Sequence, residues 1–536
     1  MTEPKVNTDK ALGLGKTATG GILAVFSSRI ASKLVSLVGS VILVRLLISP
    51  ANFGILSVAT VLPGLTMLGD VTGAYSALQK DVAAFKAGGD SARAWSSFWT
   101  VLLVKGVTGA CLSVLAFLLS FPVAELLGKP NVAPFFQIGS ILPLVWVLQN
   151  SGKVLIAMDK SRYYALLDIL DEILLSACPI IPVLMGFGIY GAMVGLVMGN
   201  VLFLIATLSV LVREMSHLIP PDKRSIQFRL TFIRVTKWGL PLGISNSFGS
   251  FTGQLINLIV ARFVSLGIYG LYSVASSAVS FVGYVDDAIG SVAYPTFSKL
   301  EIKNEPATLQ VIFRYAVKFS TIAVIPMALF ASIFAKPIIV FLFGAQYTSA
   351  GPYLTILSLA FLAYGLGSGL ISDMLQSQGY TKFLGGLAIM YTSIQVVVAA
   401  FVIPTFGFIP YLLANLFVFV PTFIIKVRKA RKTLGIFPPL KAVFPVYVSA
   451  AVSAIPSILL QLLYLPEVPK IILGAFILLT IYFVTLVMLG GISTGDIQLA
   501  KSILASQPII GKPVNAFLMI LDRLSRSAIK QKNQVK

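Results

Sequence analysis

Residues 44 to 63 read VRLLISPANFGILSVATVLP, and residues 260 to 279 read VARFVSLGIYGLYSVASSAV. With one gap allowed, part of the first stretch recurs 216 positions later: Gly54, Ser57, Val58 and Ala59 match Gly270, Ser273, Val274 and Ala275. The same offset aligns Asp70 with Asp286. Matches that stay collinear over several segments indicate an internal duplication, as in many transporters. The pattern therefore predicts two similar halves.

The chain has the composition of a membrane protein. Of its 536 residues, 57% are hydrophobic and 11% are charged, and the mean hydropathy is +0.91. Soluble domains are about 45–50% apolar and about 25% charged. A membrane-spanning helix takes roughly 20 apolar residues, so such helices fill the length and leave little room for an ATP-hydrolysing domain. We therefore expect an all-α polytopic membrane protein.

Apolar segments of spanning length divide the chain into blocks. There are 14 of them, at about 17–48, 53–79, 98–121, 132–157, 163–186, 188–212, 238–264, 266–294, 315–345, 352–377, 382–404, 408–426, 442–465 and 469–490. The first six form a predicted N-lobe (17–212) and the next six a predicted C-lobe (238–432), joined by a cytoplasmic linker (213–237). Helices 13 and 14 (442–490) have no partner in the repeat. Because six is even, both halves enter the membrane from the same side, and the pseudo-two-fold axis follows the membrane normal.

The basic residues predict the orientation. Of the 41 Lys and Arg residues, 32 fall in segments that are cytoplasmic if the amino terminus is inside, and three fall in outer loops. Short basic loops stay in the cytoplasm. We therefore expect a multi-pass protein of the cell (plasma) membrane, with a cytoplasmic amino terminus (1–16) and a cytoplasmic basic tail (491–536). Helical spacing of apolar residues over 513–530 predicts a helix on the membrane surface.

Three short motifs resemble those of a known transporter family. They are RLLISPANFG (45–54), GIYGLYSVA (267–275) and LFGAQYTSAGPYL (342–354). They resemble the Wzx-type lipid-linked oligosaccharide flippases of the multidrug/oligosaccharidyl-lipid/polysaccharide (MOP) superfamily, over roughly residues 20 to 430. The resemblance implies a MATE-like fold, with two six-helix lobes around a central cavity. It also implies alternating-access transport of a polyprenyl-phosphate- or polyprenyl-diphosphate-linked oligosaccharide.

Six basic residues lie inside the predicted spans: Arg29, Lys33, Arg45, Lys105, Lys153 and Arg262. A cation at the membrane centre costs about 2.5–3.5 kcal/mol, so a functional reason is expected. Arg29 and Lys33 are four residues apart and share a helix face. We expect them to line a hydrated cavity and bind an anionic phosphate, with an internal ion pair as the alternative.

The other four basic residues lie nearer the ends of their spans. Arg45 and Arg262 occupy equivalent outer ends and are assigned to the same headgroup, with snorkelling as the alternative. Lys105 and Lys153 are expected to snorkel to the inner face.

Acidic residues inside the spans concentrate toward the cytoplasmic half. Asp70, Asp286 and Asp373 lie near inner ends, and Asp168, Asp171 and Glu172 share one face of helix 5. We expect these six to act in gating or ion coupling. Either they pair with lysines to latch an inner gate, or they bind a coupling cation, Na⁺ or H⁺. A helix-terminal structural role for the repeated pair, Asp70 and Asp286, stays open.

Other functions compete with lipid-linked glycan transport. A MATE-like drug or cation exporter would favour an acidic or aromatic cavity, whereas a peptidoglycan-precursor flippase differs only in cargo. A membrane glycosyltransferase or polymerase would need catalytic groups in a sizeable loop, but the predicted outer loops are short and the single histidine, His217, has no Cys or His companion. We expect no enzyme activity, metal or cofactor. The expected partners are the glycan substrate, membrane lipids and glycosyltransferases or a polymerase of the same pathway, but not nucleic acid, despite a net charge of +21.

Overall fold

The computed structural model describes residues 19–70, 73–86, 91–219, 226–299, 306–492, 495, 496 and 498. These residues form helices and no strand, so the all-α prediction is confirmed for this part of the chain. The predicted amino-terminal segment (1–16) and the predicted surface helix over 513–530 lie outside the described residues. The chain is a multi-pass membrane protein, and its helices divide into two compact units.

The first unit runs from α2 into α13, as far as Ser277, and also includes Thr381–Thr422. Its helices up to the first break in the description are α2 (Thr19–Leu47), α3 (Pro50–Ala59), α4 (Val61–Thr66) and η1 (Met67–Gly69). After them come α5 (Ala74–Lys86), α6 (Ser91–Leu126), η2 (Pro130–Val132), α7 (Ala133–Gly139), α8 (Leu142–Gln149), η3 (Asn150–Lys153), α9 (Val154–Ala157), α10 (Ser161–Pro182), η4 (Val183–Phe187), α11 (Gly188–Leu218), α12 (Phe228–Phe263) and α13 (Leu266–Lys299).

The second unit contains Ala278–Tyr380 and the described residues from Phe423 onward. Besides the end of α13, it includes α14 (Pro306–Ile333), α15 (Ala335–Phe343), η6 (Ala345–Ala350), α16 (Gly351–Tyr364), α17 (Ser368–Ser377), α20 (Leu440–Gln461) and α21 (Glu467–Met488). The helix α18 (Thr381–Phe406) belongs to the first unit, and α19 (Phe408–Leu434) passes from the first unit to the second. The unit bounds therefore differ from those of the predicted lobes.

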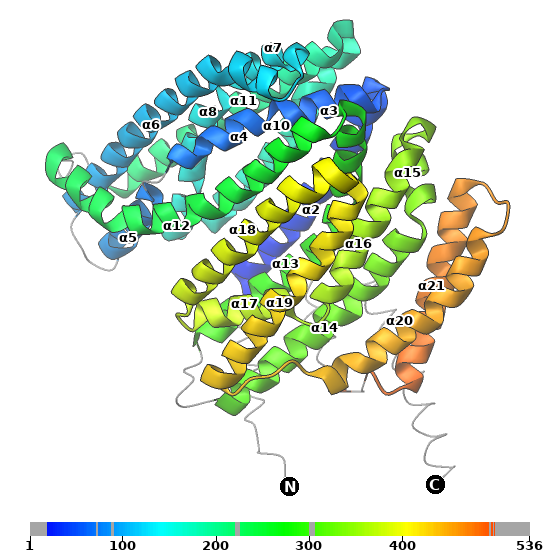
Figure 1. Cartoon of the computed structure of the whole chain (residues 1–536). Coiled ribbons are helices and arrows are strands. Elements are labelled where there is room, and N and C mark those ends of the chain that lie inside the picture. The colour runs from blue at the N-terminus through cyan, green and yellow to red at the C-terminus, as the bar shows by residue number, and fades with distance from the viewer. Residues whose placement is uncertain are drawn as a thin grey trace. The chain divides into compact units, whose positions relative to one another are not determined.

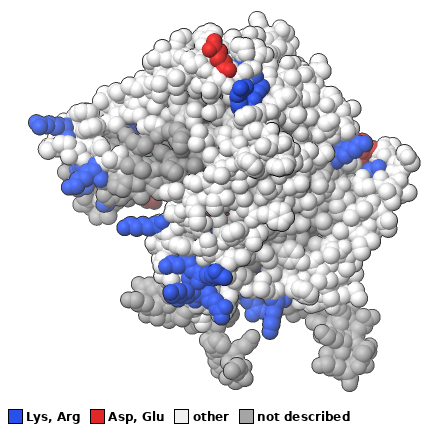
Figure 2. All heavy atoms as spheres, viewed as in Figure 1, with Lys and Arg blue, Asp and Glu red and all other residues white. Residues whose placement is uncertain are grey.

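Long apolar helices dominate the described residues. Nine of the described helical segments are long and apolar enough to cross a membrane, or ten if the bent pair Ala345–Ala363 and Ser368–Ser377 is one span. One of the nine, Ser161–Leu218, contains two of the 14 predicted segments. The predicted segment 53–79 is instead divided among α3, α4, η1 and α5. Figure 2 shows a broad face with almost no charged side chains and Lys and Arg gathered near its edges, as expected of a lipid-facing surface.

Glycines at positive φ end several helices within apolar runs. Gly186 (φ 91°) and Gly188 (φ 55°) separate α10 from α11, and Gly367 (φ 82°) separates α16 from α17 at a 51° bend. Residues with a β-carbon rarely adopt this conformation. Because Gly186 and Gly188 turn the chain, α11 packs back on α10, and a β-carbon at Gly195 would lie 2.1 Å from the carbonyl oxygen of Cys178. Hydropathy detects such apolar runs but not the turns inside them.

Each of the two units has its own cluster of buried hydrophobic side chains. In the first unit, buried side chains from α5, α6, α9, α10, α11 and α12 form one cluster that includes Phe98, Leu155 and Met215. In the second unit, α14, α20 and α21 bury a cluster that includes Ile325, Val446 and Tyr482. Helices α20 and α21 run side by side as a hairpin (Figure 1). These are the predicted helices 13 and 14.

Candidate functional site

The strongest candidate site lies where α2 packs against α10. The approach is close, since a β-carbon at Gly39 would lie 2.2 Å from Ser176 Oγ. About two turns before Gly39, Lys33 Nζ forms an ion pair with Glu172 Oε1, and Ser32 Oγ donates a hydrogen bond to Asp168 Oδ2 at 3.4 Å. The Lys33 side chain is 28% exposed and that of Glu172 is 15% exposed. Lys33 thus forms the internal ion pair given above as the alternative, yet it keeps an accessible face.

The described contacts do not join Lys33 to the other predicted headgroup ligands, Arg29, Arg45 and Arg262. The side chain of Arg29 lies outside the described part of the chain. Arg45 is exposed near the end of α2. Arg262, near the end of α12, donates from Nη1 to the carbonyl oxygen of Leu127 at 3.4 Å. A grouping of these arginines with Lys33 stays a prediction.

Arg262 belongs to a contact between α12 and the loop after α6. Lys129 Nζ donates a hydrogen bond to the Ala261 carbonyl oxygen, next to Arg262. Burial, and secondly the nearby Arg262 guanidinium, lower the pKa of the Lys129 ammonium. Lys129 therefore binds a carbonyl oxygen of α12, and Arg262 binds a carbonyl oxygen of the loop after α6. Together the two cations tie the loop to the end of the helix.

Asp70 forms a buried ion pair with Lys105 of α6. The Lys105 side chain is only 3% exposed, so Lys105 does not snorkel as expected; its ammonium group has a partner close by. At the repeat offset of 216, Asp286 replaces Asp70 and Thr321 replaces Lys105. There Asp286 Oδ1 accepts a hydrogen bond from Ser320 Oγ at 2.5 Å. The carboxylates at these two aligned positions therefore have different partners, a cation at Asp70 and a hydroxyl group at Asp286.

The remaining acidic residue on the predicted list, Asp373, lies on α17 in the second unit. A β-carbon at Gly290 would lie 2.6 Å from Asp373 Oδ2, and one at Gly369 would lie 2.9 Å from Asp286 Oδ2. Glycines on α13 and α17 therefore leave room for both carboxylates in one region of this unit. Within the described residues, no group of three His, Cys, Asp or Glu side chains is suited to hold a metal ion.

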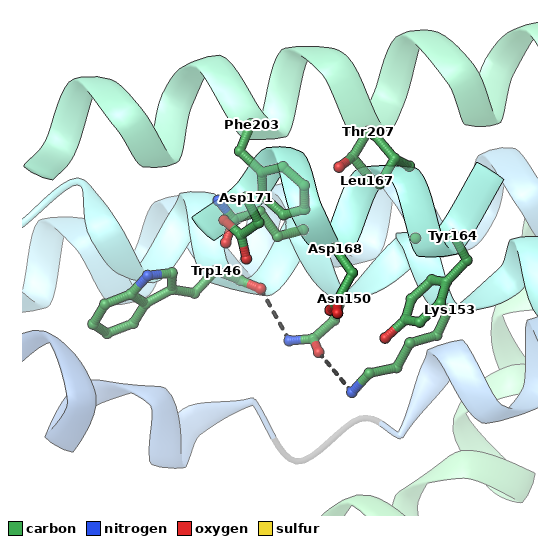
Figure 3. A pocket seen from close by; sticks show the side chains of 11 residues that line it. Trp146, Asn150, Lys153, Tyr164, Leu167, Asp168, Asp171, Phe203 and Thr207 are labelled. Atoms are coloured by element: carbon green, nitrogen blue, oxygen red, sulfur yellow. Dashed lines mark hydrogen bonds between the residues drawn. The ribbon is translucent and has the colours of Figure 1, made fainter. Parts of the chain in front are cut away.

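A cavity of about 260 Å³ lies in the first unit beside the α2–α10 contact. Figure 3 shows that α8, η3, α10 and α11 supply its lining. Asp168 and Asp171 project into it from α10, and on η3 Lys153 Nζ donates a hydrogen bond to Asn150 Oδ1 at 3.1 Å. The cavity therefore combines two carboxylates with one ammonium group.

One charge cluster was missed by the sequence analysis. Asp81, 5% exposed on α5, accepts hydrogen bonds from Arg93 Nε at 3.1 Å and Arg234 Nη2 at 3.0 Å, and one from Ser97 Oγ. These donors come from α6 and α12. Asp81 was placed in a predicted cytoplasmic loop, where a carboxylate is ordinarily solvated.

The duplicated motifs meet at two glycines. A β-carbon at Gly54 would lie 1.8 Å from the carbonyl oxygen of Leu266, and one at Gly270 would lie 1.9 Å from that of Pro50. Pro50 and Leu266 are themselves 216 residues apart, the offset that relates Gly54 to Gly270. Such a reciprocal contact is what a two-fold axis between α3 and α13 produces.

Solved structures with the same fold are membrane transporters. The lipid II flippase MurJ, in an inward closed conformation, matches 86% of this chain and 97% of its own, with a TM-score of 0.70 and 15% identity. An inward-facing multidrug resistance MATE family transporter of the MOP superfamily matches 77% of this chain and 94% of its own, with a TM-score of 0.54 and 16% identity. The chain therefore has the fold that MurJ and this MATE family transporter share.

The amino-acid sequence shows the family to which the chain belongs. The chain belongs to the polysaccharide biosynthesis protein family, whose model matches residues 42–352. Among its relatives, the succinoglycan biosynthesis transport protein ExoT of Rhizobium meliloti (strain 1021) is 27% identical over 362 residues, which cover 65% of this chain and 66%, just under two thirds, of ExoT. An uncharacterized membrane protein of Methanocaldococcus jannaschii is 26% identical over 200 residues, 39% of its length.

Proposed function

We propose that the protein flips a polyprenyl-phosphate- or polyprenyl-diphosphate-linked oligosaccharide across the cell membrane by alternating access, for the assembly of a polysaccharide or a glycoprotein glycan. Membership of the polysaccharide biosynthesis family and the similarity to ExoT support the glycan as cargo. The observation that carries the headgroup assignment is Lys33, a partly exposed cation within an apolar helix. Such a charge is costly in the membrane and marks an ion or substrate path.

Glu172 has a defined place in this proposal. An ammonium group in a low-dielectric site needs a counter-ion, and Glu172 supplies one while no substrate is bound. A phosphate or diphosphate carries more charge and more acceptor oxygens than a carboxylate. The headgroup therefore displaces Glu172 from Lys33, with Arg29 and the outer arginines, Arg45 and Arg262, as further ligands. The glycan then occupies the predicted hydrated cavity, while the prenyl tail stays in lipid.

The rest of the predicted mechanism belongs to the same proposal. The 14 spans form two six-helix lobes plus two C-terminal helices, and both termini are cytoplasmic, as the distribution of basic residues supports. Asp70, Asp168, Asp286 and Asp373 latch the inner gate or couple an ion to the cycle. Glycosyltransferases or a polymerase of the same pathway supply and use the glycan.

Drug export fits less well, because the proposed headgroup ligands are cationic. A peptidoglycan precursor would use the same headgroup chemistry.

Two opposite substitutions at the ion pair test the headgroup assignment. Lys33→Ala removes the cation, whereas Glu172→Gln removes its competitor and leaves the cation. With polyprenyl-diphosphate-linked oligosaccharide added to purified protein in nanodiscs, we expect about tenfold weaker binding for Lys33→Ala and tighter binding than wild type for Glu172→Gln. If the pair serves packing alone, the two variants will change binding in the same direction.

Transport is tested separately in proteoliposomes containing the labelled lipid-linked oligosaccharide. The double variant Arg29→Glu/Lys33→Glu should lose flipping while it remains folded, whereas Lys382→Glu, an exposed cation at the start of α18, should retain it. Normal flipping by the double variant would refute the proposed function.

A further inference from the structure

A basic patch lies in the second unit, where α19 ends and α20 begins. Six Lys and Arg residues fall between positions 426 and 441, and the sequence has no Asp or Glu from 374 to 466. Four of these cations are exposed and form the junction patch: Arg428, Arg431, Lys432 and Lys441. Within the described chain, none of the four is in an ion pair with an acidic side chain. The junction patch therefore presents positive charge at the surface.

Helix stability explains only part of this patch. The carboxyl end of a helix carries partial negative charge, which suits Arg431 and Lys432 in the last turn of α19. The amino end of a helix favours anions instead. Lys441 nevertheless lies in the first turn of α20, which has no acidic residue and no side-chain cap. An anion from outside the chain would satisfy both Lys441 and the amino end of α20.

The turn between the two helices is held in place. Residues 435–439 separate α19 from α20 (Figure 1). The Gln310 side chain of α14 binds the backbone of Phe437 twice, since Nε2 donates to its carbonyl oxygen at 3.2 Å and Oε1 accepts from its N–H group at 3.1 Å. The Phe437 side chain is 50% exposed, and Arg431 Cζ lies 5.8 Å from the centre of its ring. An apolar ring is thus fixed beside a cation at the surface.

Apolar side chains continue from the patch along α20. Leu440 is 60% exposed, and Phe444, one turn further on, is 67% exposed. Both α19 and α20 are long and apolar enough to cross a membrane, so their junction lies where a membrane meets water. Apolar groups at such a place enter the acyl region, while basic side chains reach the headgroups. A soluble acidic protein would leave these apolar groups uncovered, whereas a lipid engages them and the cations together.

We propose that the junction patch binds the phosphate headgroup of an anionic phospholipid, with Phe437 in contact with the acyl region. The headgroup phosphate is an acceptor for guanidinium and ammonium groups. Basic segments next to a membrane-spanning helix recognise anionic lipids in this way. The inference goes beyond the proposed function, because none of these residues is a proposed ligand of the glycan headgroup.

The test is native mass spectrometry of the delipidated full chain in detergent, titrated separately with phosphatidylglycerol and phosphatidylcholine of the same acyl chains. Only phosphatidylglycerol has a net negative charge, and we expect its first molecule to bind at least tenfold more tightly. Each cation near a membrane surface contributes about fivefold. The variant Arg428→Gln/Arg431→Gln/Lys432→Gln should therefore lose this preference. An unchanged preference in the folded variant would overturn the proposal.

The matched control removes the same charge from the first unit. Arg213→Gln/Arg229→Gln/Lys382→Gln replaces three exposed cations and should keep the preference for phosphatidylglycerol. Equal losses in the two triple variants would show that net charge alone attracts the lipid, and would overturn the assignment to the junction patch. If the patch variant does not fold, Lys441→Gln decides, because it removes a cation from a helix amino end and should not impair folding. We expect about fivefold weaker binding of phosphatidylglycerol, and unchanged binding would overturn the proposal.

Two further arms test the turn and the source of the phosphate. Gln310→Ala retains every cation but releases the Phe437 backbone, so phosphatidylglycerol should bind about threefold more weakly. No change would overturn the role of the fixed turn. Inorganic phosphate at the concentration of the lipid should not displace phosphatidylglycerol, and displacement would assign the patch to a free anion. Because no arm contains glycan, failure here is distinct from failure of flipping.

Discussion

In the buried ion pair between Lys105 and Asp70, the Lys105 side chain is almost inaccessible, and Asp70 is its anionic partner. Removing one member of a buried ion pair leaves an uncompensated charge and costs about 3–5 kcal/mol. We expect Asp70→Leu to lower the free energy of unfolding by that amount, measured in micelles titrated with a denaturing detergent. The double variant Asp70→Leu/Lys105→Met should recover most of the loss, since apolar replacements of a pair are often neutral.

The matched control is Lys153→Met, which removes an exposed lysine from the same unit and should change the free energy of unfolding by less than about 1 kcal/mol. If the losses from Asp70→Leu and Lys105→Met instead add in the double variant, the two residues do not stabilise each other.

Individual residues also show what could and could not be predicted from the sequence. The cost of a charge in an apolar helix was sufficient to select Lys33, because that cost is local. Its partner was not predictable, since Glu172 is 139 positions away. Likewise, helical spacing placed Asp168, Asp171 and Glu172 on one face, but it could not tell which of them faces α2 and which faces the cavity. That depends on the packing of α2 and α11 against α10.

At the level of elements, the apolar runs were found more reliably than their interruptions. The segments 163–186 and 188–212 correspond closely to α10 and α11, because a glycine turn separates two long apolar runs. The segment 352–377 was predicted as one helix, whereas the structure contains α16 and α17 with Gly367 between them. A single glycine in an apolar run does not reveal its φ angle, which is set by the surrounding packing.

The contact between α3 and α13 gives a prediction at this scale. Gly54→Ala and Gly270→Ala each place a methyl group where a backbone carbonyl lies, so the two helices must move apart. Overpacking of this kind costs about 1–3 kcal/mol, and each variant should lower the thermal unfolding midpoint by several degrees. Gly267→Ala is the matched control on α13, because no atom lies within 4 Å of its added β-carbon. Equal midpoints for all three variants would show that α3 and α13 do not need this approach.

The junction of α5, α6 and α12 depends on Asp81. Asp81→Ala leaves the Arg93 and Arg234 guanidinium groups without their shared acceptor. Because both arginines are partly exposed and can be hydrated, we expect a loss near the lower end of the range for charged hydrogen bonds, about 1.5 kcal/mol. Thermal unfolding in detergent measures it against Lys80→Ala, the exposed neighbour on α5. No difference between the two variants would contradict the role of Asp81.

For the whole molecule, the distribution of basic residues predicts the topology. In a background with Cys111 and Cys178 replaced by serine, Lys470→Cys should react in intact cells with a membrane-impermeant maleimide. Lys382→Cys should react only after permeabilisation, because it lies in a predicted cytoplasmic loop. The opposite pattern would invert the proposed orientation and move both termini to the outside.

The contact between Gly54 and Gly270 also bears on how the protein responds to its surroundings. Two backbones meet there without any side chain between them, so the contact has no group to protonate, no charge for salt to screen and no rotamer to reset. Its strength should therefore be the same in acidic, alkaline, dilute and concentrated media. Any sensitivity of activity to acidity or ionic strength must then originate at charged residues elsewhere in the chain, and the glycine pair offers a fixed reference against which that sensitivity can be measured.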